Sequence, residues 1–140
     1  MSIIVTDTGF GPDTWEKGYT AFGEATNDVT ALDVPSDVNP ADIPLSSSLK
    51  MVRVDFPSSH DGRGFTIARL LRLRGYTGRL RARGHVIADQ YAMARRCGFD
   101  EIEISQTLAA RQPEDQWLFR ADWQAHNYQA RLRGQTNAAI

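Results

Sequence analysis

The sequence predicts an α/β fold: a small, mostly parallel sheet built from consecutive β-α-β units, of the partial-barrel or open three-layer type, with a C-terminal helix packed over it. Two observations support this prediction. Between residues 49 and 112, strand-like segments alternate three times with segments of helical periodicity. The connections between them are short, which is typical of a parallel sheet with right-handed crossovers.

We expect residues 1–140 to form a single domain, of which residues 1–48 are a less regular N-terminal part. The stretch "SIIVTD" predicts a short strand at an edge of the sheet, and "VTALDVP" predicts a second strand. Between them "TGFGPDTW" is rich in turn residues, and Asp13 could cap a short helical turn there. The stretch "PSDVNPADIPLSSS" indicates a connection with a possible helical turn after Pro40.

Residues 49–112 form the predicted β-α-β-α-β core. In chain order we expect a strand in "LKMVRVDF", a helix in "GRGFTIARLLRLRG", a strand in "TGRLRARG", a helix in "HVIADQYAMARRCG", a strand in "FDEIEIS" and a helix in "QTLAARQ". In the first helix, Ile67, Leu70 and Leu71 recur at helical spacing. Gly75 and Gly98 are natural helix stops.

Residues 113–140 predict a C-terminal helical segment, one long or broken helix that begins near Pro113. It carries four aromatic residues, Trp117, Phe119, Trp123 and Tyr128. In the strand "RLRARG", Arg79, Arg81 and Arg83 lie two apart and therefore share a face. Because parallel strands buried on both faces are continuous apolar runs, we expect this face to be open to solvent or covered by a partner. The C-terminal segment is a candidate cover.

The composition is ordinary for a soluble globular chain, with 41% hydrophobic and 24% charged residues. Apolar runs are far shorter than the roughly 20 residues of a membrane span, and the N-terminus lacks the pattern of a secretory signal. Cys97 is the only cysteine, so an internal disulfide is excluded and a cysteine-built metal site is disfavoured. We therefore expect a cytoplasmic protein.

The charges are divided unevenly along the chain. Residues 1–61 hold ten acids and three bases, whereas residues 62–140 hold seven acids and thirteen bases. Between Arg63 and Arg83 there are seven arginines and no acid. Such a segment favours an anionic ligand or an acidic partner surface, unless the two halves of the domain neutralise each other. Nucleic-acid binding is the least favoured class, because these arginines are split between a helix and a strand and no recognised motif accompanies them.

Ligands of parallel sheets bind at the carboxyl ends of the strands, in the turns that lead into helices. Three such turns are "PSSHDGRG", "GHVIAD" and "ISQT". We expect them to bring together the polar residues His60, Asp61, Arg63, His85, Asp89, Ser105 and Gln106. This convergence predicts a site, and the candidates for catalysis are Asp61, Arg63 and Asp89.

Arg63 is expected at a helix N-terminus, beside backbone N–H groups that attract anions, and its guanidinium could hold sulfite, sulfate or phosphate. Alternatively, Asp61 caps the helix, Arg63 pairs with Asp55 or Asp89, and the two glycines of "DGRG" only relieve backbone strain. Asp89 could orient Arg63, act as a base, or stand in a first helical turn for dipole reasons alone.

Redox and cofactor motifs are not evident. Cys97 lies at the C-terminal end of its helix, where the helix dipole disfavours a thiolate, so we expect a buried structural cysteine. The sequence has no clustered set of Cys and His, and "GRG" is not the G-x-G-x-x-G fingerprint of dinucleotide binding. We expect no metal and no cofactor bound by this chain alone.

The motifs "DGRG", "ARLLR", "DQ" and "RCGFD" in combination resemble a bacterial family of unknown function, whose members are usually labelled as oxidoreductases of sulfite reduction. The resemblance covers most of residues 49–104. The matching positions are Asp55, Asp61, Gly62, Arg63, Gly64, Arg69, Arg72, Arg81, Asp89, Gln90, Arg96, Cys97, Gly98 and Phe99. Of these we expect ligand contacts from Asp61, Gly62, Arg63, Gly64, Arg81, Asp89 and Gln90. The family more often has an acid at position 85 and an aromatic residue within "PSSH", which weakens His60 and His85 as catalytic candidates.

The resemblance implies an accessory protein or oxidoreductase component of assimilatory sulfite reduction, acting with sulfite reductase or another sulfate-assimilation enzyme. It does not imply that this chain itself transfers electrons. The alternative is a small anion-binding enzyme or ligand-binding domain that uses the DGRG turn, with its reaction open. A sheet of few strands could also be completed by a second copy in a homodimer.

Overall fold

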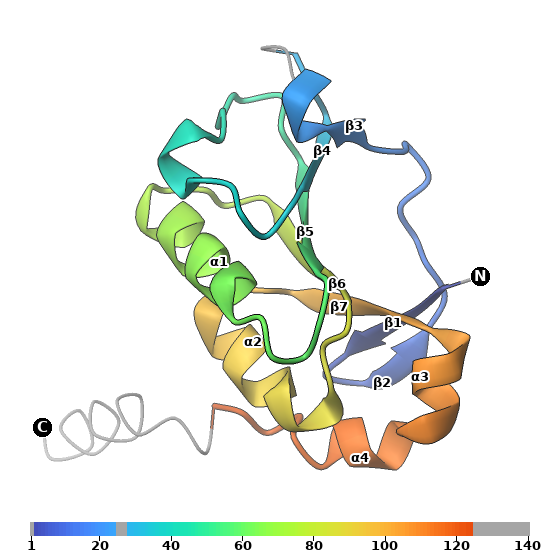
Figure 1. Cartoon of the computed structure of the whole chain (residues 1–140). Helices are drawn as coiled ribbons and strands as arrows, with labels where there is room; N and C mark the ends of the chain where they lie inside the picture. The colour runs from blue at the N-terminus through green and yellow to red at the C-terminus, as the bar shows by residue number, and fades with distance from the viewer. Residues whose placement is uncertain (1, 25–27, 125–140) are drawn as a thin grey trace, which may run out of the picture.

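The computed structural model describes residues 2–24 and 28–124, and in this range the strands form one seven-stranded sheet (Figure 1). The strand order is β2-β1-β7-β6-β5-β4-β3. The parallel part comprises β3 (Thr20–Ala21), β4 (Ala31–Val34), β5 (Met51–Phe56), β6 (Arg79–Gly84) and β7 (Glu101–Ser105). Strand β1 (Ser2–Thr6) runs antiparallel to β7 and to β2 (Gly9–Gly11). The predicted α/β fold with a mostly parallel sheet is confirmed.

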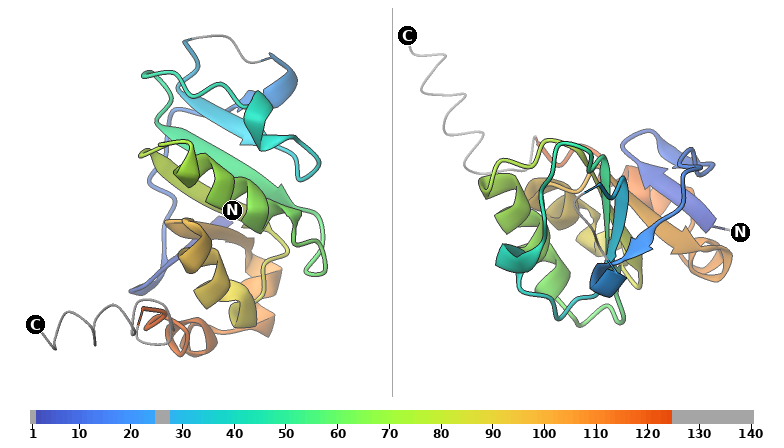
Figure 2. Two further views of the ribbon diagram at one scale, coloured as in Figure 1. Left: turned by 90° about the vertical axis from the view of Figure 1, so that its left-hand side faces the viewer. Right: turned by 90° about the horizontal axis from the view of Figure 1, so that it is seen from above.

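Two helices cover one face of this sheet, as Figure 2 shows from their side. Helix α1 (Arg63–Leu73) joins β5 to β6, and helix α2 (Tyr91–Cys97) follows the 3-10 turn η3 (Ala88–Gln90) after β6. They bury apolar side chains against alternate residues of the central strands, such as Val52 and Val54. Helices α3 (Gln106–Arg111) and α4 (Glu114–Leu118) follow β7 and pack near β1 and β2.

Both predicted helix stops are glycines with left-handed backbone. Gly98 has φ of 113° and donates its N–H to the carbonyl oxygens of Ala94 and Arg95. Gly75, with φ of 97°, follows the last turn of α1. Only glycine adopts this conformation without a steric penalty from Cβ, so the chain can turn sharply toward β6 and β7.

The N-terminal part is more regular than its composition indicates, because residues 2–34 supply four strands of the sheet. Strand β1 was expected at an edge, but it lies inside the sheet, since residues 9–11 of the predicted turn region form the edge strand β2. Asp13 caps no helical turn. Two short 3-10 turns, η1 (Phe22–Glu24) and η2 (Pro40–Asp42), flank β4, and the second confirms the helical turn predicted after Pro40.

Residues 12–19, which we call the strap, connect β2 at one edge of the sheet with β3 at the other. The strap therefore crosses the face opposite to α1 and α2 (Figure 1). The Tyr19 ring lies 3.7 Å from the Arg53 guanidinium carbon, and the Thr14 hydroxyl accepts a hydrogen bond from Arg79 at 3.0 Å.

Under the strap lies a network that we call the charge ladder. Its basic members are Arg53, Arg79, Arg81 and Arg83, and its acidic members are Asp13, Asp33, Glu101 and Glu103. At its centre the Arg81 side chain is 0% exposed. Its guanidinium lies 2.6 Å from a Glu101 carboxylate oxygen, 2.9 Å from Glu103 and 3.0 Å from Asp13.

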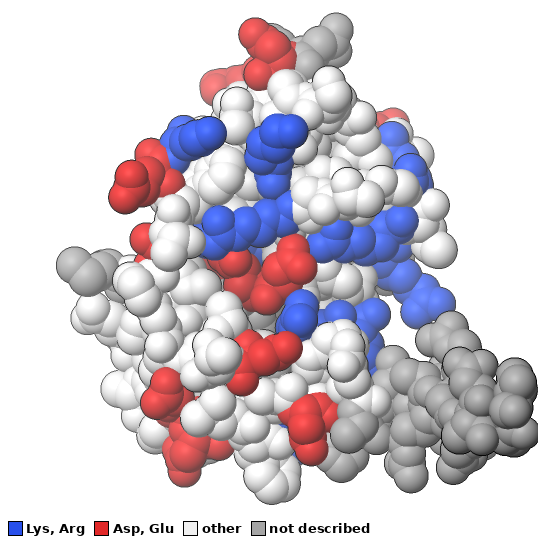
Figure 3. Space-filling view, turned by 180° about the vertical axis from the view of Figure 1, so that it is seen from behind, with Lys and Arg blue, Asp and Glu red and all other residues white. Residues whose placement is uncertain are grey.

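The outer arginines of the charge ladder pair with Glu101 and Glu103 as well, and Arg53 also pairs with Asp33. Arg53 donates to Asp33 at 2.6 Å and to Glu103 at 3.1 Å, and Arg79 donates to Glu101 at 2.7 Å. The face of the strand "RLRARG" is thus only partly open, since Arg81 is buried whereas Arg83 is exposed, and among the described residues it is the strap that crosses this face. Alternate acids of β7 and the strap neutralise it, because buried guanidinium groups require carboxylate partners. In the view from behind, acidic and basic side chains lie next to one another across the molecule (Figure 3).

The described part of the C-terminal segment is broken, since the α-helix that starts after Pro113 ends at Leu118. Trp117 is buried against Tyr91, with the ring centroids 6.2 Å apart. The predicted continuation beyond residue 124, including Tyr128, lies outside the described residues. Among the described residues, no helix has the length and apolar character that crossing a bilayer requires. A homodimer was expected because a sheet of few strands could be completed by a second copy. The sheet has seven strands, so this reason no longer applies, and the homodimer stays a proposal.

We predict that Arg81→Met lowers the free energy of unfolding by about 3–5 kcal/mol, because Glu101 and Glu103 would remain buried without their central cation. Urea denaturation followed by circular dichroism measures this loss. The matched control is Arg83→Met on the same strand face, whose side chain is half-exposed and 3.6 Å from Glu103. Its loss should stay below about 1 kcal/mol. Equal losses in the two variants would contradict a central role for Arg81.

We also predict a pH-dependent contribution from Asp13. Its hydrogen bonds with Arg81 lower the pKa of the Asp13 carboxyl below the ordinary value of 3.8. The stabilisation is therefore complete above that ordinary pKa and is lost as the pH falls toward the lowered one. Asp13→Asn should cost about 1 kcal/mol at pH 7 and less at pH 3, measured by urea denaturation at both pH values. The same cost at both would exclude the ionised carboxylate as the cause.

Candidate functional site

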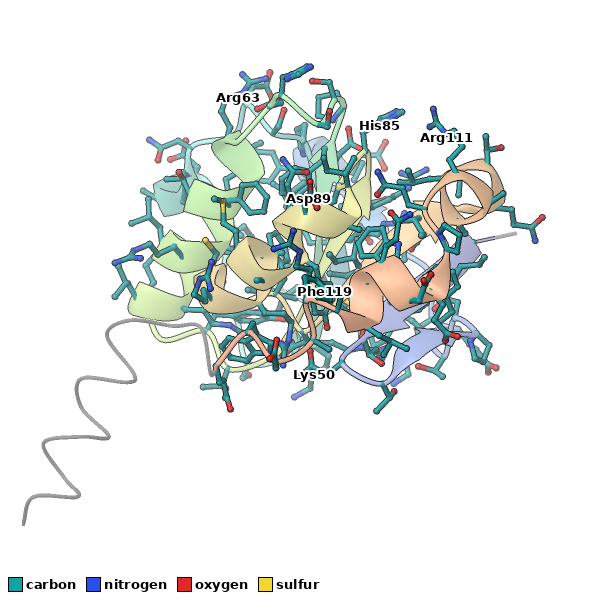
Figure 4. The ribbon with its side chains drawn as sticks, turned by 90° about the horizontal axis from the view of Figure 1, so that it is seen from below. Lys50, Arg63, His85, Asp89, Arg111 and Phe119 are labelled. Atoms are coloured by element: carbon teal, nitrogen blue, oxygen red, sulfur yellow. The ribbon has the colours of Figure 1, made fainter. Side chains whose placement is uncertain are left out.

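The carboxyl ends of β4 to β7 bring four connections to one edge of the sheet, which we call the carboxyl edge. Figure 4 shows Arg63, His85 and Arg111 along this edge, whereas Lys50, which precedes β5, lies on the opposite side. The three predicted turns therefore do meet at one edge. The connection after β4 joins them, because Ser36 contacts the DGRG turn.

The DGRG turn is organised by an ion pair between its own residues. The Arg63 guanidinium donates to both carboxylate oxygens of Asp61, at 3.0 and 2.8 Å, and to the hydroxyl of the buried Ser36 at 3.1 Å. Asp61 also accepts the backbone N–H of Arg63, the first residue of α1, at 3.1 Å, while the N-cap position itself is Gly62. These hydrogen bonds hold the pKa of the Asp61 carboxyl far below its usual range. Arg63 thus pairs with Asp61 and not with Asp55 or Asp89.

This pairing limits the positive charge with which Arg63 could bind an anion. Its side chain is 60% exposed, but Asp61 already matches its charge. The adjoining hollow, of about 350 Å³, is lined by Ser36, Asp37 and Thr66 besides Arg63, and the Asp37 carboxylate helps to raise the pKa of Arg63. Two carboxylates, Asp61 and Asp37, therefore act on the single guanidinium of Arg63.

The two glycines of the turn have different roles. A Cβ on Gly64 would stand 2.4 Å from the ring of Phe56, so the absence of a side chain lets α1 approach the end of β5 closely. A Cβ on Gly62 would meet only Phe65, at an ordinary 4.0 Å. Gly64 is thus required by packing, whereas no contact requires Gly62.

Asp89 and Gln90 stand apart from Arg63. The exposed Asp89 accepts a hydrogen bond from Arg120 at 3.1 Å. Gln90 joins two of the carboxyl-edge connections, because its side chain donates to the carbonyl oxygen of Ser59 at 2.8 Å and accepts the N–H of Ile87 at 3.0 Å. Gln90 therefore links the connections after β5 and β6 by hydrogen bonds.

The other sequence candidates have structural contacts or are exposed. Ser105 caps α3 by accepting the N–H of Leu108 at 3.1 Å, and Gln106 and His60 are exposed. Arg81, expected to contact a ligand, is instead buried in the charge ladder on the face under the strap. It points to that face because its neighbours Leu80 and Ala82 point to the helices.

Several positions of the family motif contribute to packing. Arg72 donates to the carbonyl oxygens of Tyr76, Gly78 and Gly98 and to the carboxylate of Asp100, which joins the end of α1 to the start of β7. Phe99 is buried and packs edge-on against Phe56 at 5.8 Å.

Cys97 is half-buried between α1 and α2. Burial raises the pKa of its thiol more than the charges of Arg69 and Arg96 lower it, which is the expectation for a structural cysteine. Within residues 2–24 and 28–124, no group of three Cys, His, Asp or Glu side chains is placed to hold a metal ion.

The outer surface of α1 and α2 combines apolar and basic side chains. We call it the helix face, and it comprises Arg69, Leu70, Leu73, Met93 and Arg96. Leu73 is 72% exposed and Met93 49%. Arg69 and Arg96 form no ion pair with any residue that the structure describes, and neither helix contains an acid.

Two features of the carboxyl edge were missed by sequence reasoning. Ser36 follows the predicted strand "VTALDVP", so the turn after that strand should have been counted with the other three. Arg111 is displayed beside His85 from the last turn of α3 (Figure 4). No turn motif predicts this position, because Arg111 lies at the end of a helix and not in a turn after a strand. The helix α3 is only six residues long, so its C-terminal end still lies near the carboxyl edge.

Comparison with known proteins adds one match. A family model described as bacterial protein of unknown function (DUF934) matches residues 31–138. No curated protein and no solved structure matches the chain. The matched range begins at β4 and includes the parallel strands β4 to β7 with α1 and α2.

We predict that Gly64→Ala lowers the free energy of unfolding by about 1–3 kcal/mol, because its methyl group would overlap the Phe56 ring. Gly62→Ala, two residues away in the same turn, should change stability by less than about 0.5 kcal/mol. Thermal and urea unfolding of both variants provide the measurement. A destabilisation that is larger for Gly62→Ala would contradict the packing argument.

Proposed function

Because the chain belongs to the DUF934 family of bacterial proteins of unknown function, we propose that it is an accessory protein of assimilatory sulfite reduction. In this proposal it acts in the cytoplasm, by contact with sulfite reductase or another sulfate-assimilation enzyme. The pathway rests on the motif resemblance, and the mode of action rests on the helix face.

The helix face has the composition of a contact surface for an acidic partner. Leu73 lies four residues after Arg69, and Met93 lies three residues before Arg96, so each apolar side chain neighbours a cation on its helix surface. Arg69 and Arg96 lie on two helices that pack against each other, and the charges of both lower the pKa of the Cys97 thiol. An apolar centre with unpaired cations around it favours a partner that presents carboxylates around an apolar patch.

The charge of the helix face also disfavours a second copy as its occupant. In a twofold dimer the same patch of both copies would meet, which would bring like charges together. Elsewhere in the described chain, eight basic residues form ion pairs within the molecule, among them the four arginines of the charge ladder. The unpaired charge of Arg69 and Arg96 is therefore available to a partner.

The alternative, an anion-binding domain that uses the DGRG turn, has weaker support. Arg63 is exposed, but Asp61 and Asp37 offset its charge.

Growth of a strain that lacks this protein tests the pathway. We predict failure to grow with sulfate or sulfite as the sole sulfur source and normal growth with sulfide, because only the first two require sulfite reduction. Growth yields on the three sources are the measurement. Normal growth on sulfite would exclude the proposed pathway.

The contact surface is tested by complementation of the same strain and by binding to purified sulfite reductase. We predict that the double variant Arg69→Glu, Arg96→Glu restores no growth on sulfite and binds the reductase at least tenfold more weakly, through like-charge repulsion (about 1.4 kcal/mol or more). The matched control is Lys17→Glu, Lys50→Glu, which also reverses two cations that form no ion pair with the described residues. Equal loss in both variants would indicate a general effect of net charge.

A further inference from the structure

A hollow of about 450 Å³ opens at the carboxyl edge, beside the DGRG turn and separate from the helix face. Its walls come from the connection after β5, the connection after β6, and α3. Ser58, Ser59, His85 and Arg111 supply polar groups around it, and Ile87 and Leu108 supply apolar surface. In Figure 4, His85 and Arg111 extend from the same end of the edge.

The charge of this hollow is positive, in contrast to the surroundings of Arg63. No aspartate or glutamate belongs to its lining. The Arg111 guanidinium forms no ion pair or hydrogen bond with any residue in the described part of the chain. Two serine hydroxyls and an imidazole stand in the same lining, and both kinds of group can donate hydrogen bonds to an oxyanion.

The walls of the hollow are held in place before any ligand binds. Gln90 ties the connection after β5 to the connection after β6, at Ser59 and Ile87. Gln112, at the end of α3, accepts the backbone N–H of Ala88 at 2.7 Å and so ties α3 to the second connection. Since ordering of loops opposes binding, walls that are already fixed lower the cost of binding.

We propose that this hollow binds an oxyanion group of the sulfite, sulfate or phosphate class, either as the free ion or as the end of an organic ester. Arg111 would hold two of its oxygens through parallel hydrogen bonds, while His85 and the serine hydroxyls donate to the remaining oxygens. Ile87 and Leu108 would contact the organic part of an ester. The site is independent of the proposed contact with a reductase, since it shares no residue with the helix face.

The test is thermal unfolding of the full chain with sodium sulfite, sodium sulfate, sodium phosphate or 4-nitrophenyl sulfate, each compared with sodium chloride at the same ionic strength. At about 100 times the dissociation constant, a bound anion should raise Tm by roughly 5–10 °C. Stabilisation by the ester alone would identify an organic ester as the ligand, and stabilisation by the free ions would identify the ion itself. Either result supports the site, whereas stabilisation by none of the four would overturn it.

Substitutions in the lining test whether the anion binds in this hollow. Arg111→Gln should weaken binding at least tenfold, and His85→Asn should weaken it to a smaller degree, with dissociation constants measured by calorimetry. The control is Lys50→Gln, an exposed lysine on the side opposite to the carboxyl edge that forms no ion pair with the described residues (Figure 4). It should bind like the unaltered protein. Because Arg111 has no partner in the described chain, its substitution should leave Tm without ligand unchanged. Binding by Arg111→Gln with unchanged affinity would refute the proposal.

Discussion

The buried guanidinium of Arg81 is the interaction on which the arrangement of the sheet depends. It lies in the central strand β6 and meets carboxylates from the neighbouring strand and from the strap, Glu101, Glu103 and Asp13. A buried charge is tolerated only when it is fully paired, so the strap must return to this point of the sheet. In doing so it joins the two outermost strands, β2 and β3, across the same face. One arginine thus couples the N-terminal residues to strands that follow much later in the chain.

The charge ladder explains why an arginine-rich segment does not make an arginine-rich surface. Between Arg63 and Arg83, six of the seven arginines contact carboxylates or backbone carbonyls within the molecule. Arg69 is the exception among the described residues. Together with Arg96 and Arg111 it belongs to the cations that the acidic first half of the chain does not neutralise. These few positions, rather than the whole segment, carry the positive charge that a ligand or partner could meet.

Two candidate surfaces then remain, and they lie on different parts of the molecule. The helix face is formed by the outside of α1 and α2, whereas the hollow with His85 and Arg111 opens at the carboxyl edge (Figure 4). Gln90, which stands just before α2, contacts the loops at that edge. Because the two surfaces share no residue, a partner on the helix face would leave the hollow accessible. Gln90 lies between them and is fixed by its hydrogen bonds to Ser59 and Ile87.

The sequence by itself determined the parallel core. The strand and helix periods from residue 49 to residue 112, and the glycines at 75 and 98, depend on neighbours along the chain, so their structure could be inferred locally. For the same reason the meeting of the turns at one edge was predictable from strand order alone. The contacts of single side chains could not be predicted in this way. Whether Arg81 faces a ligand or a carboxylate depends on Asp13 and Glu103, which lie 68 and 22 residues away from it in sequence. The hydroxyl of Ser36, which joins the local pair of Arg63 and Asp61, comes from 27 residues away. Only the tertiary structure decided these pairings, because burial and charge compensation are properties of the assembled sheet and strap.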